Sequence, residues 1–171
     1  MTDTSCGPAR FQPLRIVSGG QTGVDRGALD AAMALGIPHG GWCPKGRLAE
    51  DGTIPLLYEL TETGSPAYAV RTERNVLDSD ATIILCRGRP SGGTELTFRL
   101  AKRHAKPCLV MDLHKPALVG VRRWLATVRP ATLNVAGPRE SQAPGITSQA
   151  AEFLVRLLAP PRATRRRRAE G

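Results

Sequence analysis

The chain has 171 residues, of which 41% are hydrophobic and 23% are charged, a composition typical of one globular domain with a substantial core. No apolar run approaches the roughly 18 residues of a membrane span, and the amino-terminal segment has no apolar signal-peptide core. The formal net charge is +9, but only 4% of residues are aromatic and no nucleic-acid-binding motif occurs. We therefore expect a cytoplasmic protein that is neither inserted in a membrane nor dedicated to nucleic acid.

Part of the positive charge belongs to the carboxyl terminus. From residue 159 onward the chain contains five arginines, four of them consecutive at 165–168, and one glutamate. Such a run is typical of a disordered tail that contacts nucleic acid or acidic lipid only non-specifically. We predict a flexible lead (1–13), a single domain (14–159) and a disordered, arginine-rich tail (160–171).

The cysteines are widely spaced, and none has a histidine or a second cysteine at the spacing of a zinc site. In a reducing compartment we expect free thiols, two of them in predicted strands. No metal site is therefore predicted. The four cysteines are Cys6, Cys43, Cys86 and Cys108.

The first predicted elements are a strand (14–18) and a helix (24–35), joined by a turn that contains three glycines. Glycines let the backbone approach an anion closely, and the unpaired N–H groups at the start of a helix attract it. The turn matches neither the P-loop nor the dinucleotide fingerprint. Because it also concentrates polar groups, we predict a ligand site here. Its candidate residues are Ser18, Gly19, Gly20, Gln21, Thr22, Gly23, Asp25 and Arg26.

The alternative is a tight connection in which the glycines serve packing alone. Thr22 and Asp25 have the spacing of a capping box, so Asp25 would then cap the start of the helix. Arg26 would pair with a neighbouring carboxylate. The sequence leaves both interpretations open.

The next segment (38–55) has no helical or strand period and is rich in turn residues. Loops of this length in a compact domain are usually functional or disordered. Trp42 could stack on a flat ring, and Lys45 and Arg47 could bind an anion, so we predict a loop that folds over the ligand. A surface insertion with a half-buried Trp42 is the alternative.

Beyond this loop, short apolar runs alternate with amphipathic stretches. Residues 81–86 (ATIILC) are apolar on both faces, which is typical of an interior strand of a parallel sheet. With about five strands and five helices, the chain is predicted to be an α/β protein, a Rossmann-like three-layer sandwich with a mainly parallel sheet. The other predicted strands cover 57–60, 108–113 and 132–136, and the other helices cover 66–78, a stretch after Gly92, 116–128 and 145–158.

Two further strand ends carry polar turns. Gly92, Gly93 and Thr94 lie where strand 81–86 gives way to a helix, and Arg139 belongs to the loop after strand 132–136. The turns of a parallel sheet open at one edge, so we expect them to face the same pocket as the first glycine turn.

The predicted helix 66–78 has a polar face. Arg71, Glu73, Arg74 and Asn75 contribute to it, and we expect this face to be solvated or to lie between subunits. The alternative is that Arg74 and Asn75 reach the pocket.

With all three strand-end loops considered, the chain resembles the putative molybdenum carrier family, a YpsA-like branch of the SLOG superfamily. The resemblance rests on several separated motifs that follow the family's order. They are SGGQTGVDRGALDAA (18–32), GWCPKGRLAEDG (41–52), RTERNVLDSDATIIL (71–85), SGGTELT (91–97), KP (106–107) and NVAGPRES (134–141).

This resemblance implies a Rossmann-like fold, a homo-oligomer (dimer or tetramer), and relatives that bind molybdenum cofactor and shield it from oxidation. The phosphate of that cofactor would suit the turn at 19–23 or at 92–94, and its flat pterin would lie against Trp42. Its metal oxo group would take donors such as Lys45 or Arg47. Ser91 and Arg139, from the matching motifs, complete the candidate binding residues.

Two other functions remain open within the superfamily: phosphoribohydrolases and non-catalytic nucleotide-ligand sensors. The hydrolases resemble this chain through a P-G-G-x-G-T-x-x-E turn whose glutamate takes part in catalysis. Here the third residue after Thr94 is Thr97, and Glu95 is displaced by two positions, roughly 200° around a helix. We therefore assign no catalytic residue and favour a binding or carrier function over hydrolysis.

Overall fold

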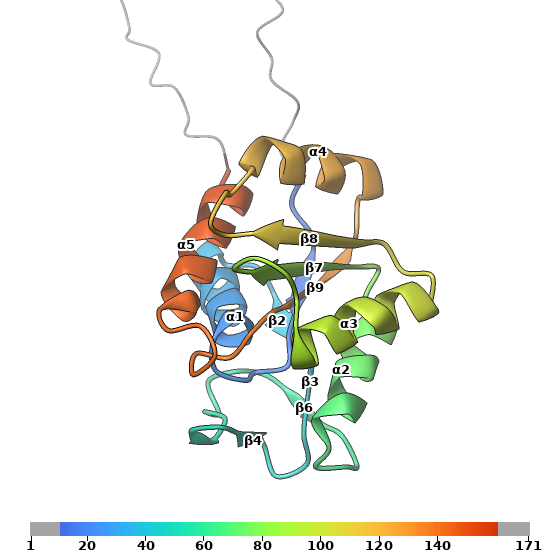
Figure 1. The fold of residues 1–171 in the computed structure, drawn as a ribbon, viewed down its shortest axis with the longest axis vertical. Helices are drawn as coiled ribbons and strands as arrows, with labels where there is room; N and C mark the ends of the chain where they lie inside the picture. The colour runs from blue at the N-terminus through green and yellow to red at the C-terminus, as the bar shows by residue number, and fades with distance from the viewer. Residues whose placement is uncertain (1–10, 161–171) are drawn as a thin grey trace, which may run out of the picture.

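The computed structural model describes residues 11–160 and has the predicted α/β architecture (Figure 1). Five strands form one sheet in the order β2-β1-β9-β7-β8, and each neighbouring pair is parallel. The last strand in the chain, β9, therefore lies at the centre of the sheet. The strands are β1 Arg15–Val17, β2 His39–Gly40, β7 Ala81–Cys86, β8 Cys108–Asp112 and β9 Thr132–Ala136.

Helices cover both faces of the sheet, which makes three layers. One face carries the main core, where side chains of β1, β7 and β9 pack against α1, α4 and α5. On the other face, α2 and α3 pack together around Val76, Leu100 and Ala101. The helices are α1 Val24–Leu35, α2 Tyr68–Leu77, α3 Gly92–Arg103, α4 Leu118–Val128 and α5 Ile146–Leu158.

The continuous apolar run of β7 is explained by this arrangement. All six of its residues are buried, because helices lie on both faces and strands on both sides. Ile83 and Leu85 point into the main core, together with Leu133 and Val135 of β9. The sequence prediction of an interior parallel strand is thus confirmed.

The segment between α1 and α2 contains short strands that the sequence did not predict. β3 (Trp42–Cys43) pairs with β6 (Thr61–Glu62), and β4 (Leu48–Ala49) pairs with β5 (Gly52–Thr53). The predicted strand at 57–60 is wrong, since those residues form a turn followed by irregular backbone. Leu56 and Leu57 are 84% and 56% exposed, so their hydrophobicity reflects no buried strand.

Parts of the sequence predictions fall outside the described residues. These are most of the flexible lead (1–13), with Cys6, and the arginine-rich tail beyond residue 160. Within the lead, Phe11 packs against the main core, and the guanidinium of Arg129 lies 5.1 Å from its ring centre. No helix between residues 11 and 160 is long and apolar enough to cross a membrane.

Candidate functional site

Three loops meet at the carboxyl edge of the sheet: β1–α1, β7–α3 and β9–α5. Two cavities lie between them. The first, which we call the Gln21 cavity, is lined by residues from all three loops and from α2, including Gln21, Asp25, Tyr68, Arg71, Gly93, Thr94, Thr97, Arg139 and Gln142. The second, the Cys86 cavity, lies between the β7–α3 and β9–α5 loops.

The glycines of the β1–α1 turn are in contact with protein. A Cβ added to Gly19 would lie 1.6 Å from Nη1 of Arg71, and one on Gly20 would lie 2.4 Å from Cδ1 of Leu60. Gly23 has a φ of 83°, and its Cβ would lie 2.2 Å from the backbone oxygen of Pro138. These glycines are needed because other parts of the chain approach the turn closely.

The predicted capping box is wrong. Helix α1 begins after Gly23, and no described side chain caps its start. Thr22 instead donates its hydroxyl to the carboxylate of Glu50, and the Asp25 carboxylate accepts from Arg71 and from the backbone N–H of Gln21. Thr22 is therefore bound to a distant part of the chain, whereas Asp25 is shared between the distant Arg71 and the backbone just ahead of the helix.

Asp25 and Arg71 form a buried ion pair beside the Gln21 cavity. Nη1 of Arg71 lies 2.9 Å from Oδ2 of Asp25, and the two side chains are 13% and 4% exposed. Burial raises the pKa of Asp25, and the positive charge of Arg71 opposes that rise. Arg71 thus stabilises the charged form of the Asp25 carboxyl group, whereas burial favours its neutral form.

The predicted polar face of α2 is wrong for two of its residues. Arg71 faces the Gln21 cavity rather than solvent. Asn75 is 3% exposed, accepts from the N–H of Trp42 at 2.8 Å and donates to its carbonyl at 2.9 Å. The helical period placed both residues correctly on one side of α2, but that side faces the Gln21 cavity at Arg71 and strand β3 at Asn75.

Gln21 is buried and held in a fixed orientation. Its Oε1 accepts from the backbone N–H of Thr22 at 3.0 Å and of Glu50 at 2.9 Å. These two donors fix which end of the amide is the oxygen, so Nε2 points the other way. Among residues 11–160, neither Nε2 of Gln21 nor Nε of Arg71 has a hydrogen-bond partner, although both atoms are buried.

Two unpartnered donors on the lining of one cavity are unusual. Buried polar groups are nearly always hydrogen-bonded, and each unsatisfied donor costs roughly 1–3 kcal/mol. Gln21 and Arg71 both line the Gln21 cavity. The two unpartnered donors therefore belong to residues of the same cavity.

The β7–α3 turn is open where the first glycine turn is covered. A Cβ on Gly92 or Gly93 would meet no described atom within 4 Å. The N-cap residue Ser91 makes no side-chain cap with the described chain, and its carbonyl accepts from the N–H groups of Thr94 and Glu95. The positive end of α3 therefore faces open space next to the Gln21 cavity.

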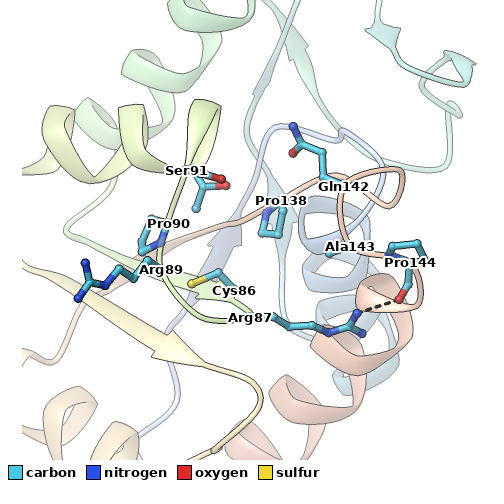
Figure 2. A pocket seen from close by; sticks show the side chains of 10 residues that line it. Cys86, Arg87, Arg89, Pro90, Ser91, Pro138, Gln142, Ala143 and Pro144 are labelled. Atoms are coloured by element: carbon cyan, nitrogen blue, oxygen red, sulfur yellow. Dashed lines mark hydrogen bonds between the residues drawn. The ribbon is translucent and has the colours of Figure 1, made fainter.

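The Cys86 cavity has a volume of about 250 Å³ (Figure 2). Cys86 lies at its centre, and Arg87 and Arg89 lie on opposite sides. Nη1 of Arg87 donates to the carbonyl of Pro144 at 2.9 Å, and its Nε donates to Gln149 at 2.9 Å. Thr94 and Gln142 line both cavities, so the two adjoin each other.

The remaining predicted residues lie elsewhere. Trp42 donates from Nε1 to Asp78 at 2.6 Å and has Arg74 over its ring. Arg47 donates to four backbone carbonyls of residues 54–60, so it organises its own loop. Neither these two nor the exposed Lys45 lines a cavity described between residues 11 and 160.

The structure separates the predicted residues of the first turn. Gln21 and Asp25 line the Gln21 cavity, whereas Arg26 pairs with Asp51, with 2.5 Å between Nη1 and Oδ2. The predicted pairing of Arg26 with a neighbouring carboxylate is confirmed. Arg139 does reach the Gln21 cavity, where its guanidinium lies 4.8 Å from the ring centre of Tyr68.

The sequence reasoning missed several lining residues, namely Tyr68, Arg71, Arg87, Arg89, Thr97 and Gln142. Arg71 is the first residue of the matching motif RTERNVLDSDATIIL, and this position was the one feature of the sequence that could have indicated it as a site residue. Thr97 closes the matching motif SGGTELT and lies within α3, and the rest lie on loops or at the start of α2, whose proximity depends on the order of the strands.

Two further observations concern hydrolysis and metal binding. The side chain of Glu95 is 51% exposed, lies 3.9 Å from Arg99 and lines neither cavity. No group of three or more His, Cys, Asp or Glu side chains between residues 11 and 160 could hold a metal ion.

The five-stranded parallel sheet, with its cavities at the carboxyl edge, defines a Rossmann-like α/β protein. The chain belongs to the circularly permutated YpsA SLOG family, whose model matches residues 16–158. It is also similar to the crystal structure of the putative molybdenum carrier protein from Syntrophus aciditrophicus SB, with 42% identity and a TM-score of 0.83. That match covers 87% of this chain and 96% of the other. No curated protein gave a significant match.

Proposed function

We propose that this protein binds molybdenum cofactor, or a related phosphate-bearing pterin or nucleotide, at the carboxyl edge of its sheet. The observation that carries the proposal is the pair of buried donors without partners, Nε2 of Gln21 and Nε of Arg71. The two residues that carry these donors, Gln21 and Arg71, line the cavity into which the open start of α3 faces. A phosphate offers several acceptor oxygens and negative charge, which suits all three features.

The residues fit a phosphate group better at the second glycine turn than at the first. Gly93 leaves room at the start of α3, whereas Arg71, Leu60 and Pro138 already occupy the space beside Gly19, Gly20 and Gly23. Arg71 is balanced by Asp25, so Arg139 supplies the additional positive charge. Gln21, Arg71 and Arg139 would therefore hold the phosphate.

Molybdenum cofactor would contribute a phosphate, a flat pterin and a metal oxo group. Support for this ligand comes from the similar protein that is named a molybdenum carrier. Its phosphate has the donors described above. Trp42, which we predicted to stack on the pterin, is held by Asp78 and Arg74 instead, so the ring needs another surface.

Equilibrium binding of molybdenum cofactor and of nucleoside monophosphates to the purified protein tests the proposal. The variant Gly93→Ala adds a methyl group at the cavity without a backbone clash, and it should weaken binding by about tenfold. Gly120→Ala, on the distant helix α4, is the matched control and should bind normally. Absence of binding to the unaltered protein, or full affinity in Gly93→Ala, would refute the proposal.

Chromatography of the same samples separates a carrier from a hydrolase. A carrier returns its ligand intact, whereas hydrolysis of a nucleotide would release a base and ribose phosphate. We expect the intact ligand, because Glu95 lies outside both cavities. The homo-oligomer implied by the family resemblance remains a prediction, which light scattering coupled to size-exclusion chromatography can test.

A further inference from the structure

The Cys86 cavity is left unused by the proposed phosphate site. Pro90, Pro138 and Pro144 line it, and the thiol of Cys86 lies between them (Figure 2). Cys86 is 3% exposed, and burial, assisted by the nearby Asp112, raises the pKa of its thiol. The thiol at the base of this cavity is therefore uncharged at neutral pH, and it donates to the carbonyl of Gly88 at 3.2 Å.

The positive charges around this cavity do not make it a second phosphate site. The guanidinium of Arg87 already donates to Pro144 and Gln149. Arg89 is exposed, and Figure 2 shows its guanidinium extended away from the cavity's centre. Flat proline surfaces suit the face of a ring better than a hydrated anion.

The two cavities have the spatial relation of two subsites. They adjoin at Thr94 and Gln142, on either side of the first turn of α3. The volumes are about 250 Å³ and 100 Å³, each smaller than the roughly 300 Å³ at which ligand pockets begin. Together the cavities reach that range, so a ligand with two parts would fill them.

Polar groups on the rim define which ring fits. Ser91 and Gln142 are exposed residues that line the Cys86 cavity, and they offer a hydroxyl and an amide. These groups can donate to and accept from the edge of a ring, while the prolines contact its face. Fused heterocycles such as pterins and purines combine an apolar face with such an edge.

We propose that the Cys86 cavity receives the fused heterocyclic ring of the ligand whose phosphate binds in the Gln21 cavity. This inference rests on the proposed function and assigns the surface that Trp42 does not provide. Ser91 and Gln142 hydrogen-bond to the edge of the ring. The thiol of Cys86 contacts the ring without bonding to it covalently.

The variant Ser91→Phe tests the subsite, because it places a large side chain in the Cys86 cavity and leaves the Gln21 cavity intact. The matched control is Ser148→Phe, at an exposed position on α5. Affinities are measured for a phosphorylated pterin, for adenosine monophosphate and for ribose 5-phosphate. We expect Ser91→Phe to weaken one or both ring-bearing ligands by about tenfold and ribose 5-phosphate by less than about twofold.

A second measurement needs no variant and distinguishes the two ring types. Alkylation of the thiols in the unaltered protein is followed by mass spectrometry of the peptides. The ring-bearing ligand that binds should slow alkylation of Cys86 several-fold and leave the half-buried Cys108 unchanged, because Cys108 lines neither cavity in the described chain.

The outcomes separate this inference from the proposed function. If ring-bearing phosphates bind but neither Ser91→Phe nor Cys86 alkylation responds, the ring lies elsewhere and only the subsite is refuted. Equal weakening of ribose 5-phosphate would refute the subsite as well. If no ring-bearing phosphate binds the unaltered protein, both proposals are wrong.

Discussion

The two glycine turns of this protein look alike in sequence and differ in structure. Each follows a parallel strand and precedes a twelve-residue helix. Around the β1–α1 turn, Arg71, Leu60 and Pro138 occupy the space that a Cβ would need. Around the β7–α3 turn, Gly92 and Gly93 meet no described atom within 4 Å. Paired glycines therefore do not by themselves indicate a ligand site, because at the first turn the close neighbours belong to the protein itself.

The difference arises from which segments lie beside each turn. The loop between α1 and α2 folds over the first turn and is fastened there by Glu50, which accepts from Thr22 and Ser141. The second turn faces the β9–α5 loop across the Cys86 cavity, and Gln21, Tyr68 and Arg71 across the Gln21 cavity. We expect the first turn to determine stability and the second to determine binding, and the following variants test this from the largest effect to the smallest.

Gly23→Ala should have the largest effect on stability. The backbone of Gly23 has a positive φ, and an added Cβ would lie 2.2 Å from the backbone oxygen of Pro138. Neither the backbone strain nor this contact can be relieved by moving a flexible side chain. We expect a loss of about 4 kcal/mol in the free energy of unfolding. Urea denaturation followed by circular dichroism measures it. A loss below about 1 kcal/mol would show that the first turn is not closely packed.

Arg71→Ala should destabilise the fold by about 3 kcal/mol at neutral pH, because it leaves the buried Asp25 carboxylate unpaired. Burial raises the folded-state pKa of Asp25 above its ordinary value of 3.8, so this group costs stability as pH rises through the folded-state pKa. Without Arg71 the pKa rises further, and the loss extends over a wider pH range.

Unfolding curves between about pH 4 and pH 7 test this pH dependence. Stability of Arg71→Ala should fall more steeply with rising pH than that of the unaltered protein. Adding Asp25→Asn to Arg71→Ala should remove the extra slope. If the slope persists in the double variant, another group is responsible.

Glu50→Ala should cost about 1 kcal/mol, because it releases the loop from the first turn while solvent screens the charge. Slight burial raises the pKa of Glu50, but hydrogen bonds from Ser141 and Thr22 outweigh this and lower it. The stabilisation is therefore present above about pH 4.5 and is lost as pH falls through the folded-state pKa. The difference between Glu50→Ala and the unaltered protein should shrink on acidification, as thermal unfolding can show.

Gly93→Ala should change stability least, by no more than about 0.5 kcal/mol, since alanine favours a helix and meets no obstacle. Its effect should appear in ligand affinity instead. Thermal unfolding with and without ligand measures both effects in one experiment. A large loss of stability without ligand would mean that the second turn is as constrained as the first.

Much of the fold could be predicted because the apolar runs are long and continuous. ATIILC in β7 and the periodic faces of α1 and α5 are local signals that tertiary packing reinforces. The two-residue strand β2 has no such apolar run. His39 and Gly40 form a strand because they pair with the neighbouring β1. The false strand at 57–60 contains Leu57, which is exposed, and Leu60, which is half-buried and packs against a small cluster that includes Ile54 and Tyr58.

The candidate site was predictable in its location but not in its contacts. Turns at the carboxyl ends of parallel strands share one edge, so Gln21, Gly93 and Arg139 could be grouped from topology. The ion pair of Asp25 with Arg71 joins positions 46 residues apart and has no local pattern. The direction of Trp42, towards Asp78, likewise depends on the packing of β3 against α2.

The central position of β9 has a consequence for how the chain reaches this structure. β1 is hydrogen-bonded to β2 and β9, and β7 to β8 and β9, so the two halves of the sheet are joined only through residues 132–136. Pairing of β1 with β9 closes a loop of more than a hundred residues. The conformational entropy lost in closing such a loop slows folding. During synthesis, residues 15–17 emerge early and have β2 as a neighbour, but their other partner is the last strand, which also brings the β9–α5 loop to the candidate site. We therefore expect the sheet and the candidate site to be completed together, late in folding.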